Sequence, residues 1–416
     1  MNWMSRTIQP SVLKAAGEVP VVALFGPRGA GKTELLRHLF ASSHRYCPLD
    51  DPRIRQIARE DPRLLFDQYP PPVVLDEFQF VPELIPFLRE RIDAESSPPG
   101  RYVLAASQLQ PIGHRLAEGL GARTQTLTLL SLSLQELAGQ PAGNRSWREV
   151  LLPTTADQPP SSFPGPLPVA RRILRGGFAL AAIDDASERV GPGDPMAWHS
   201  TYVQEFLERE THFLRSPQDR GAFERFLFAL ATRTGRLLNL EELARDIGIT
   251  GKTARAWIEV LEAAGQILVV HPLEASVGRR LVKRPRVYFL DTGILAFLLN
   301  VSQPDQVLSG IAAIPLFKTA VAAELARLLA HRGHSPQLYF WETAAGHRVD
   351  FVIGDGQQLI PIDTVLSSTP TPADARQIEA LQQILGDHVT RGLLVCLTRR
   401  KTVMRPTVDA VPLGAL

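Results

Sequence analysis

The sequence predicts an α/β fold whose first part is a parallel sheet of the kind that carries a phosphate-binding loop. Three observations predict it. A glycine-rich loop lies between a strand pattern and a helix pattern, a second apolar strand ends in two carboxylates, and strand and helix patterns alternate along the first third of the chain. Such alternation favours a parallel sheet with helices on both faces, and the carboxyl ends of its strands border a ligand crevice.

The glycine-rich loop is the most specific motif. The apolar run Val21–Phe25 predicts a buried strand, and the spacing from Glu34 onward predicts a helix. Between them the chain fits the pattern G-x-x-x-x-G-K-[ST], with Gly26, Pro27, Arg28, Gly29, Ala30, Gly31, Lys32 and Thr33 in order. Glycines let backbone N–H groups face phosphate oxygens, and a helix N-terminus adds positive potential. We therefore expect Lys32 to contact the β- and γ-phosphates of a nucleotide and Thr33 to ligate Mg²⁺.

A second apolar strand pattern, at 72–75, ends in Asp76 and Glu77. We expect Asp76 to hold Mg²⁺, directly or through water, and Glu77 to polarise the water that attacks the γ-phosphate. A plain surface turn would give the same pattern. Its place downstream of a phosphate loop favours the catalytic interpretation.

Further patterns complete the first sheet. Strands are predicted at 45–49, 100–108 and 123–129, and helices at 11–16, 53–60, 61–66 and 82–92. The strand at 100–108 ends in Ser107 and Gln108, which would lie beside the two nucleotide strands and sense the γ-phosphate. A turn-forming serine followed by a solvated glutamine is the alternative interpretation.

Composition excludes several classes of protein. The net charge is +2, so no overall field attracts nucleic acid and any such binding needs a local patch. The two cysteines, Cys47 and Cys396, lack metal-ligand spacing and indicate reduced core residues. No apolar stretch is long enough to span a membrane, and the first residues carry no secretory signal pattern. We expect a cytoplasmic protein with no membrane partner.

Four stretches together resemble a prokaryotic AAA+ family of ATPases with a C-terminal domain of undefined function: GPRGAGKT, VVLDEFQ, GRYVLAASQ and LTLLSLSLQEL. Stretches at 175–178, 202–210, 233–235 and 288–293 are similar to the same family. The resemblance implies an AAA+-type P-loop sheet, binding of ATP and ADP, and slow or switched hydrolysis. By analogy it also implies self-association or an unknown protein partner. Fast turnover needs an arginine finger, for which Arg123 is a candidate, within the chain or across subunits.

We expect four parts along the chain: an ATP-binding domain at 1–137, a Pro/Gly-rich linker at 138–170, a helical and winged-helix region at 171–310, and an α/β domain at 311–416. The linker composition predicts no regular element. In the third part, caps at Asn239 and Thr250 around Gly248 predict a helix-turn-helix, with strands at 266–271 and 286–290 as its wing. Basic side chains there are candidate nucleic-acid contacts: Lys252, Arg255, Arg279, Arg280, Lys283 and Arg284.

The last part resembles the restriction-endonuclease-like core that ends many members of the family. Such cores bind a divalent metal through carboxylates and position water with a lysine. Asp350 and Asp363 match the strand carboxylates, but Val365 stands at the lysine position. Lys318 stands where the family tends to have Glu, and Glu324 or Glu342 would have to substitute. The pattern predicts a degenerate, inactive nuclease-like domain.

The sequence therefore predicts a Mg²⁺-dependent, ATP-hydrolysing protein that acts as a nucleotide-driven switch. Two alternatives stay open. One is a DNA-binding regulator or scaffold that ATP gates through the winged helix. The other is an ATP-dependent nuclease, which Val365 disfavours.

Overall fold

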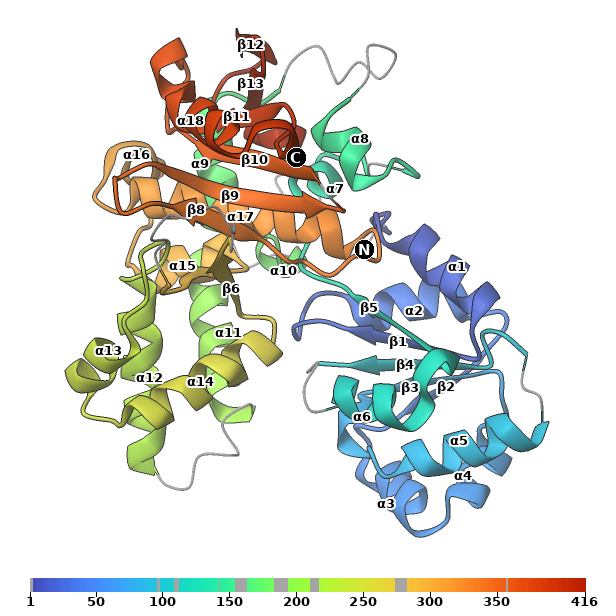
Figure 1. The fold of residues 1–416 in the computed structure, drawn as a ribbon. Helices are drawn as coiled ribbons and strands as arrows, with labels where there is room; N and C mark the ends of the chain where they lie inside the picture. The colour runs from blue at the N-terminus through green and yellow to red at the C-terminus, as the bar shows by residue number, and fades with distance from the viewer. Residues whose placement is uncertain are drawn as a thin grey trace.

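The computed structural model describes residues 3–95, 98–107, 112–141, 143–153, 163–182, 194–209, 217–273, 283–356 and 358–416. Figure 1 shows three parts: an N-terminal sheet with its helices, a helical region from the middle of the chain, and a second, longer sheet that contains the C-terminal strands. The middle helices lie on one side of the second sheet, and the N-terminal sheet lies beside both of the other parts.

The N-terminal sheet has five parallel strands in the order β2-β3-β4-β1-β5. The strands are β1 (Val21–Phe25), β2 (Arg45–Pro48), β3 (Val73–Asp76), β4 (Tyr102–Ala106) and β5 (Thr124–Thr128). The helices are α1 (Gln9–Glu18), α2 (Lys32–Phe40), α3 (Pro52–Glu60), α4 (Pro62–Gln68), α5 (Leu84–Glu95) and α6 (Ile112–Leu120), with 3₁₀ turns η1 (Phe78–Phe80) and η2 (Gly121–Arg123). The predicted parallel α/β sheet is confirmed.

β1 is apolar throughout because helices cover both faces of the sheet at its centre. Val21, Ala23 and Phe25 pack in one apolar cluster with residues of α5 and α6, whereas Val22 and Leu24 pack in another with residues of α1 and α2. Strands buried on both faces are typical of parallel sheets. Since the strands are parallel, the segments that follow β1, β3 and β4 all leave the sheet at the same edge.

After β5 the chain forms α7 (Leu134–Leu137), α8 (Trp147–Leu151), α9 (Pro166–Arg175) and α10 (Ala179–Ala182). The prediction that 138–170 contains no regular element is wrong, because α8 and the start of α9 lie within it. Ser146 and Glu149 form a capping box, in which each side chain accepts a hydrogen bond from the other residue's backbone N–H. The proline-rich run at 154–162 lies outside the described residues.

The middle region contains the predicted helix pair. Its elements are α11 (Pro195–Arg209), α12 (Pro217–Ala231), α13 (Leu240–Ile247), α14 (Gly251–Ala263), β6 (Ile267–Pro272), β7 (Arg286–Phe289), α15 (Thr292–Leu298) and α16 (Pro304–Ser309). Asn239 caps α13, left-handed Gly248 ends it and Thr250 caps α14, as predicted. β6 and β7 form an antiparallel pair. The predicted helix-turn-helix elements and the two strands after them are therefore present.

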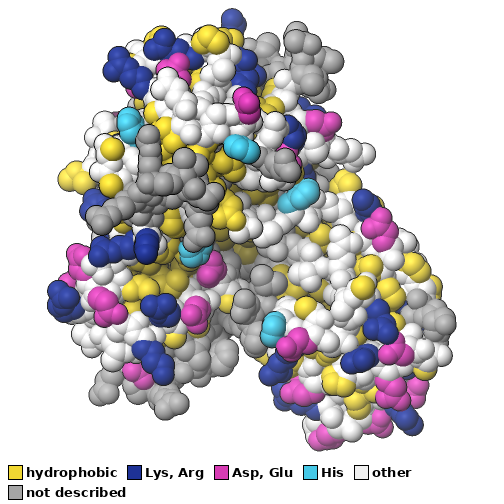
Figure 2. Space-filling model, in the orientation of Figure 1, with side chains coloured by type: hydrophobic (Ala, Val, Ile, Leu, Met, Phe, Trp, Pro, Cys, Tyr) yellow, Lys and Arg dark blue, Asp and Glu magenta, His cyan; other side chains and the backbone are white. Residues whose placement is uncertain are grey.

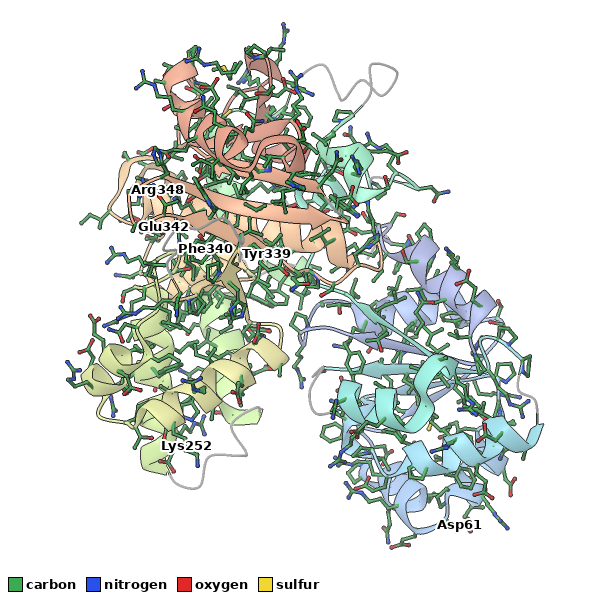
Figure 3. All side chains as sticks on the ribbon, in the orientation of Figure 1. Asp61, Lys252, Tyr339, Phe340, Glu342 and Arg348 are labelled. Carbon is green, nitrogen blue, oxygen red and sulfur yellow. The ribbon has the colours of Figure 1, made fainter. Side chains whose placement is uncertain are left out.

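The second sheet has eight strands in the order β12-β13-β11-β10-β9-β8-β6-β7. After α17 (Ala313–Ala330) come β8 (Tyr339–Glu342), β9 (Arg348–Asp355), β10 (Gln358–Thr364), η3 (Pro372–Ala375), α18 (Arg376–Leu385), η4 (Gly386–His388), β11 (Gly392–Cys396), β12 (Thr402–Arg405), β13 (Val408–Pro412) and η5 (Leu413–Ala415). β6 pairs with β8, so the strands predicted as a wing extend the C-terminal sheet across the expected boundary at 310. Figure 3 shows Tyr339, Phe340 and Glu342 of β8 where the helical region meets this sheet.

Within the described ranges, none of the helices is both long enough and apolar enough to cross a bilayer.

Candidate functional site

The glycine-rich loop connects the end of β1 to the start of α2. Gly29 and Gly31 adopt left-handed backbone conformations, with φ of 79° and 93°. A Cβ at Gly26 would lie 1.9 Å from the carbonyl oxygen of Leu129, so only glycine fits beside the segment that follows β5. The loop therefore has the backbone freedom that a phosphate cradle requires.

Lys32 crosses this loop. Its ammonium donates to the carbonyl oxygens of Gly26 (2.8 Å) and Pro27 (3.2 Å) and to Oγ of Ser107 (3.3 Å). The residue is 5% exposed, so the charge is held inside the loop rather than in solvent. Because an ammonium group and phosphate oxygens attract strongly, a bound phosphate would take over the contacts that these neutral oxygens make.

Asp76 lies at the end of β3 and is 3% exposed. One carboxylate oxygen accepts hydrogen bonds from Oγ1 of Thr33 (2.6 Å) and Oη of Tyr46 (2.5 Å), and the other accepts from the N–H of Glu77 (2.9 Å). Within the described residues every hydrogen bond to Asp76 comes from a neutral donor. A buried carboxylate next to a hydroxyl, with no cationic partner in that set, fits the oxygen ligands that Mg²⁺ prefers.

Tyr46 was not predicted as a site residue. Burial and the hydrogen bond to Asp76 raise the pKa of Tyr46 far above its ordinary value, so its hydroxyl remains a donor. Tyr46 lies on β2, the neighbour of β3. A single sequence does not reveal this contact, because nothing in the pattern of β2 says which side chain faces Asp76.

Glu77 and Ser107 are joined through Gln79. The Gln79 amide donates to the Glu77 carboxylate, and its carbonyl oxygen accepts from the N–H of Ser107 (3.2 Å). The Ser107 hydroxyl lies 3.2 Å from Oε2 of Glu77, to which it donates, while Lys32 donates to the same hydroxyl. Three predicted residues, Lys32, Ser107 and Glu77, are thus brought into one hydrogen-bonded chain. Gln79 belongs to the VVLDEFQ stretch, but the motif gave it no role.

Two other predicted residues are not placed with this group. Gln108 lies outside the described residues. Arg123 precedes β5, whose first residue pairs with Val21 at the start of β1, so Arg123 lies at the opposite, amino edge of the sheet. There its guanidinium pairs with Asp93 (2.6 Å). A role of Arg123 as the arginine finger of its own chain is therefore wrong, and a role across subunits stays a prediction.

The middle region covers the loop. The Tyr202 hydroxyl donates to the carbonyl oxygen of Arg28 (3.3 Å) and accepts from the Gln266 side chain (3.0 Å). A Cβ at Gly29 would meet the Phe178 ring at 3.5 Å. The Arg28 guanidinium faces Glu205 at 3.9 Å. A cavity of only about 20 Å³ remains between this cover and Ser107. The sequence gave no signal for these contacts, because the residues of the cover lie far along the chain from the loop, as Tyr202 and Arg28 do at a separation of 174 residues.

The candidate nucleic-acid contacts lie elsewhere. Lys252 and Arg255 are exposed on α14, and Lys283 and Arg284 are exposed before β7, whereas Arg279 and Arg280 lie outside the described residues. Lys252 lies at the end of the helical region that points away from the second sheet (Figure 3). Figure 2 shows Lys and Arg side chains interspersed with Asp and Glu over this region. The face in view is therefore mixed in charge.

The predicted carboxylate pair of the C-terminal part is present, but cations surround it. Oδ1 of Asp350 pairs with Lys318 (2.5 Å) and Arg286 (3.4 Å), and Arg286 also pairs with Glu342 (2.6 Å). Asp363 accepts from the N–H of Asp350 (3.3 Å). Burial raises the pKa of Asp350, but Lys318, Thr364 and Arg286 together lower it below its ordinary value. Burial and then the charge of Asp350 raise the pKa of Asp363 well above its ordinary value.

With these pKa directions, the positive and negative charges of the cluster are equal in number. Two cations, Lys318 and Arg286, face two carboxylates, Asp350 and Glu342, and the raised pKa of Asp363 favours the neutral form of that side chain. Val365 packs in an apolar cluster with Ala375, Ile378, Leu394 and Val408. Glu324, one of the two glutamates considered as a substitute ligand, pairs with Arg327 (2.6 Å). In the described part of the chain no group of three His, Cys, Asp or Glu side chains is suited to a metal ion.

Three family models match the chain. Residues 18–138 match an AAA domain, residues 168–305 match a domain of unknown function (DUF8612), and residues 315–416 match a second domain of unknown function (DUF4143). The first match contains every residue of the glycine-rich loop and its acidic partners. For this part of the chain it supports a P-loop ATPase of the AAA type, which binds ATP.

Curated relatives and solved structures are also similar. The uncharacterized proteins Rv2008c of Mycobacterium tuberculosis and Mb2031c of Mycobacterium bovis are each 26% identical over 400 residues, which is 96% of this chain and 81% of each relative. The Walker-type ATPase PABY2304 of Pyrococcus abyssi aligns with a TM-score of 0.43 at 15% identity, over 70% of this chain and 94% of that chain. A STAND protein with a tetratricopeptide repeat sensor, PH0952 of Pyrococcus horikoshii, aligns with a TM-score of 0.27 at 13% identity, over 79% of this chain and 47% of that one.

Proposed function

We propose that this chain binds and hydrolyses ATP with Mg²⁺ and acts as a nucleotide-driven switch. One observation carries the proposal: the Lys32–Ser107–Glu77 hydrogen-bonded chain and the Thr33–Asp76 pair lie at one edge of the sheet, beside the glycine-rich loop. An ammonium, a hydroxyl–carboxylate pair and a second carboxylate are the groups that phosphoanhydride hydrolysis requires.

Each residue has a role that follows from its place. Loop N–H groups and Lys32 would hold the β- and γ-phosphates, and Glu77 would accept a proton from, or orient, the attacking water. Ser107 touches both Lys32 and Glu77, so it is suited to sense the γ-phosphate. Thr33 and Asp76 would hold Mg²⁺, which would neutralise charge on the phosphate oxygens. Tyr46 fixes the orientation of Asp76.

The switch role is supported by the cover on the loop. Tyr202, Gln266 and Phe178 come from the middle region, yet they contact the segment that would hold phosphate. Little space remains between this cover and Ser107, where a cavity of about 20 Å³ is lined by Arg28, Tyr202 and Gln266, so a nucleotide that enters beside the loop would press against the middle region. Binding would then favour one arrangement of the two regions over another.

Replacing Lys32 by Ala tests nucleotide binding. We expect affinity for ATP to fall by about 100-fold or more, because the variant loses the buried charge that pairs with two phosphates. Equilibrium titration with a fluorescent ATP analogue measures it, and Lys14→Ala, an exposed lysine on α1, is the matched control. Unchanged affinity in the Lys32 variant would contradict the assignment.

DNA binding through the helix pair is the second candidate function. The exposure of Lys252 and Arg255 on the same helix favours it, whereas the mixed charge around them does not. If it is right, duplex DNA binding should weaken steeply with salt, and Lys252→Glu with Arg255→Glu should abolish it. A fluorescence anisotropy titration at two salt concentrations, with Glu259→Lys as the charge control on α14, measures it. If Lys252→Glu with Arg255→Glu leaves DNA binding unchanged, this surface of α14 does not bind DNA.

A nuclease is the third candidate, and the C-terminal cluster does not favour it. A divalent cation would enter a site that already holds Lys318 and Arg286, and Val365 cannot position water.

We also propose the four-part division of the chain, with a winged helix in the third part and a nuclease-like fold in the last. We further propose a cytoplasmic location, and either self-association or an unknown protein partner. The free, buried thiols of Cys47 and Cys396 are consistent with a reducing compartment.

A further inference from the structure

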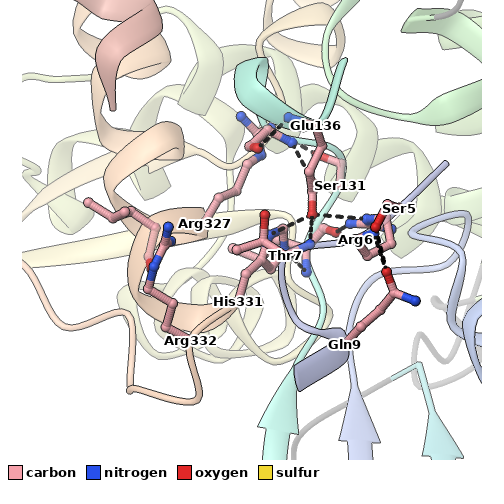
Figure 4. Close-up of polar contacts among 12 residues, drawn as sticks. Ser5, Arg6, Thr7, Gln9, Ser131, Glu136, Arg327, His331 and Arg332 are labelled. Atoms are coloured by element: carbon pink, nitrogen blue, oxygen red, sulfur yellow. Dashed lines mark hydrogen bonds and ion pairs between the residues drawn. The ribbon is translucent and has the colours of Figure 1, made fainter. Parts of the chain in front are cut away.

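A buried arginine from the N-terminal segment donates hydrogen bonds to the glycine-rich loop and to the segment after β5. Arg6 is 6% exposed and precedes α1, outside the part of the chain that matches the AAA domain. Its guanidinium donates through Nη1 to the carbonyl oxygen of Ala30 (2.7 Å) and through Nη2 to that of Leu130 (2.8 Å). Figure 4 shows Arg6 in the middle of a network of polar contacts. Arg6 thus ties the loop to the segment that follows β5.

The contact with Ala30 sets the direction of one loop amide. The C=O and N–H of a trans peptide lie in one plane and point in opposite directions. Holding the Ala30 carbonyl against Arg6 therefore turns the N–H of Gly31 away from Arg6. A Cβ at Gly31 would lie 3.4 Å from Nη1 of Arg6, so the glycine also leaves room for this approach. In a phosphate cradle the useful N–H groups face the anion, and Arg6 fixes that arrangement before the anion arrives.

The Arg6 charge is balanced by Glu136, which is also buried. Nε of Arg6 lies 3.3 Å from Oε1 of Glu136, and the same oxygen accepts from the N–H of Thr7 (2.7 Å). Burial raises the pKa of Glu136, but His331 and Arg6 lower it far below its ordinary value, so Glu136 stays ionised. A buried ion pair whose oxygens are all hydrogen-bonded keeps a defined geometry.

His331 connects this pair to the end of α17. Its Nε2 accepts from the N–H of Leu130 (3.2 Å), which requires the ring proton on Nδ1, 3.5 Å from Glu136. Burial lowers the pKa of His331, in agreement with a neutral ring. Leu130 thus contacts Arg6 through its carbonyl and His331 through its N–H. One turn earlier, Arg327 of the same helix donates to Ser131 (2.8 Å).

We propose that Arg6 is a positioning residue for the phosphate loop, and that through Glu136 and His331 it couples nucleotide binding to the packing of α17. The proposal rests on the proposed function, since it concerns regulation of that same site. Its physical basis is a continuous run of buried contacts from the Ala30 carbonyl to α17. Because Arg6 holds the Ala30 carbonyl in place, a change in its contacts with Glu136 or Leu130 would loosen the loop and weaken phosphate binding.

The first experiment measures affinity for ADP and ATP in the full chain. We expect Arg6→Met to weaken both by about tenfold, because two charge-assisted hydrogen bonds to loop-side carbonyls are lost. Arg6→Lys keeps the charge but cannot reach both carbonyls, so it should restore part of the loss. Arg63→Met, an exposed arginine on α4, is the control. If Arg6→Met fails to fold, the nucleotide affinity of Arg6→Lys tests the positioning role instead, and it should be lower than that of wild type.

The second experiment tests the coupling with a double-mutant cycle. His331→Ala should weaken ATP binding about threefold in the wild-type background and have no effect in the Arg6→Met background. A purely structural role would lower the unfolding midpoint in both backgrounds without this difference in affinity. Equal effects of His331→Ala in both backgrounds would overturn the coupling, and unchanged affinity in Arg6→Met and Arg6→Lys would overturn the positioning role.

The two failures are distinguishable. If the wild-type chain binds neither ADP nor ATP at millimolar concentration, the proposed function is wrong and the inference falls with it. If the wild-type chain binds nucleotide and the Arg6 variants bind it equally well, the proposed function stands and only the inference is overturned.

Discussion

Glu77→Gln is expected to leave ATP binding intact and to lower its hydrolysis by a factor on the order of 10² to 10⁴, the range that general base catalysis supplies. The carboxylate of Glu77 accepts from Ser107 and Gln79, and an amide of the same shape keeps one acceptor oxygen for them. The variant loses the negative charge that would draw a proton from water. Lys32 and the loop are unchanged, so the phosphates bind as before.

Two measurements check this result separately. Phosphate release at saturating ATP reports turnover, and titration with a fluorescent ATP analogue reports affinity, which should stay within about twofold of wild type. Glu90→Gln, an exposed glutamate on α5, controls for loss of charge in the same part of the chain. Wild-type hydrolysis by Glu77→Gln would refute the base assignment. A parallel loss of affinity would instead assign Glu77 to binding.

The nucleotide site could be predicted from the sequence because its residues sit at strand ends. Asp76 is the last residue of an apolar strand, and Lys32, Glu77 and Ser107 follow such strands. Parallel strands bring their carboxyl ends to one edge of the sheet. The same rule shows why Arg123 was wrong as a finger within the chain. It precedes its strand, so parallel pairing must place it at the other edge.

Residues that act from outside the motifs could not be predicted in this way. Arg6, Tyr46 and Tyr202 reach the site through contacts that depend on how whole elements pack. Strand and helix periodicity do not specify such partners. A buried polar side chain interrupts an apolar pattern, but the pattern does not show which distant residue that side chain contacts. The Ser146–Glu149 capping box, by contrast, was readable from its spacing, although the proline-rich composition around it favoured a loop.

In the C-terminal cluster, Lys318 stands where related sequences tend to have Glu, and it places a cation against Asp350 in the position where a nuclease would hold a metal ligand. The sequence predicted that Asp350 and Asp363 lie on strands and that Lys318 replaces an acidic residue, but it did not predict the contact of Arg286 with both Asp350 and Glu342. Arg286 lies on β7, so the cluster fastens the strands of the middle region to the C-terminal sheet. In this arrangement the ion pairs join a strand of the middle region to two strands of the C-terminal sheet.

Lys318→Met is accordingly expected to destabilise the C-terminal sheet by about 3 kcal/mol, because Asp350 loses its nearest cation while it stays buried. Hydrogen–deuterium exchange across β9 and β10 should then become roughly 100-fold faster wherever it proceeds through this unfolding. Lys14→Met, an exposed lysine, should have no such effect. Adding Asp350→Asn should recover most of the loss, since the uncompensated charge is removed, and a double variant no better than Lys318→Met would contradict the pairing.

The pH dependence gives an independent check on the same pair. The pKa of Asp350 is lowered in the folded chain, so its contribution to stability is complete above its unfolded value near 4 and is lost as the pH falls through the folded value. Without Lys318 the pKa of buried Asp350 is higher in the variant than in wild type, so the difference in exchange should be constant at neutral pH and shrink in acid, as the pH falls through the variant's value and Asp350 becomes protonated there first. A difference that persists undiminished in acid would mean that Lys318 stabilises the sheet by packing its methylene groups, with Asp350 playing no part.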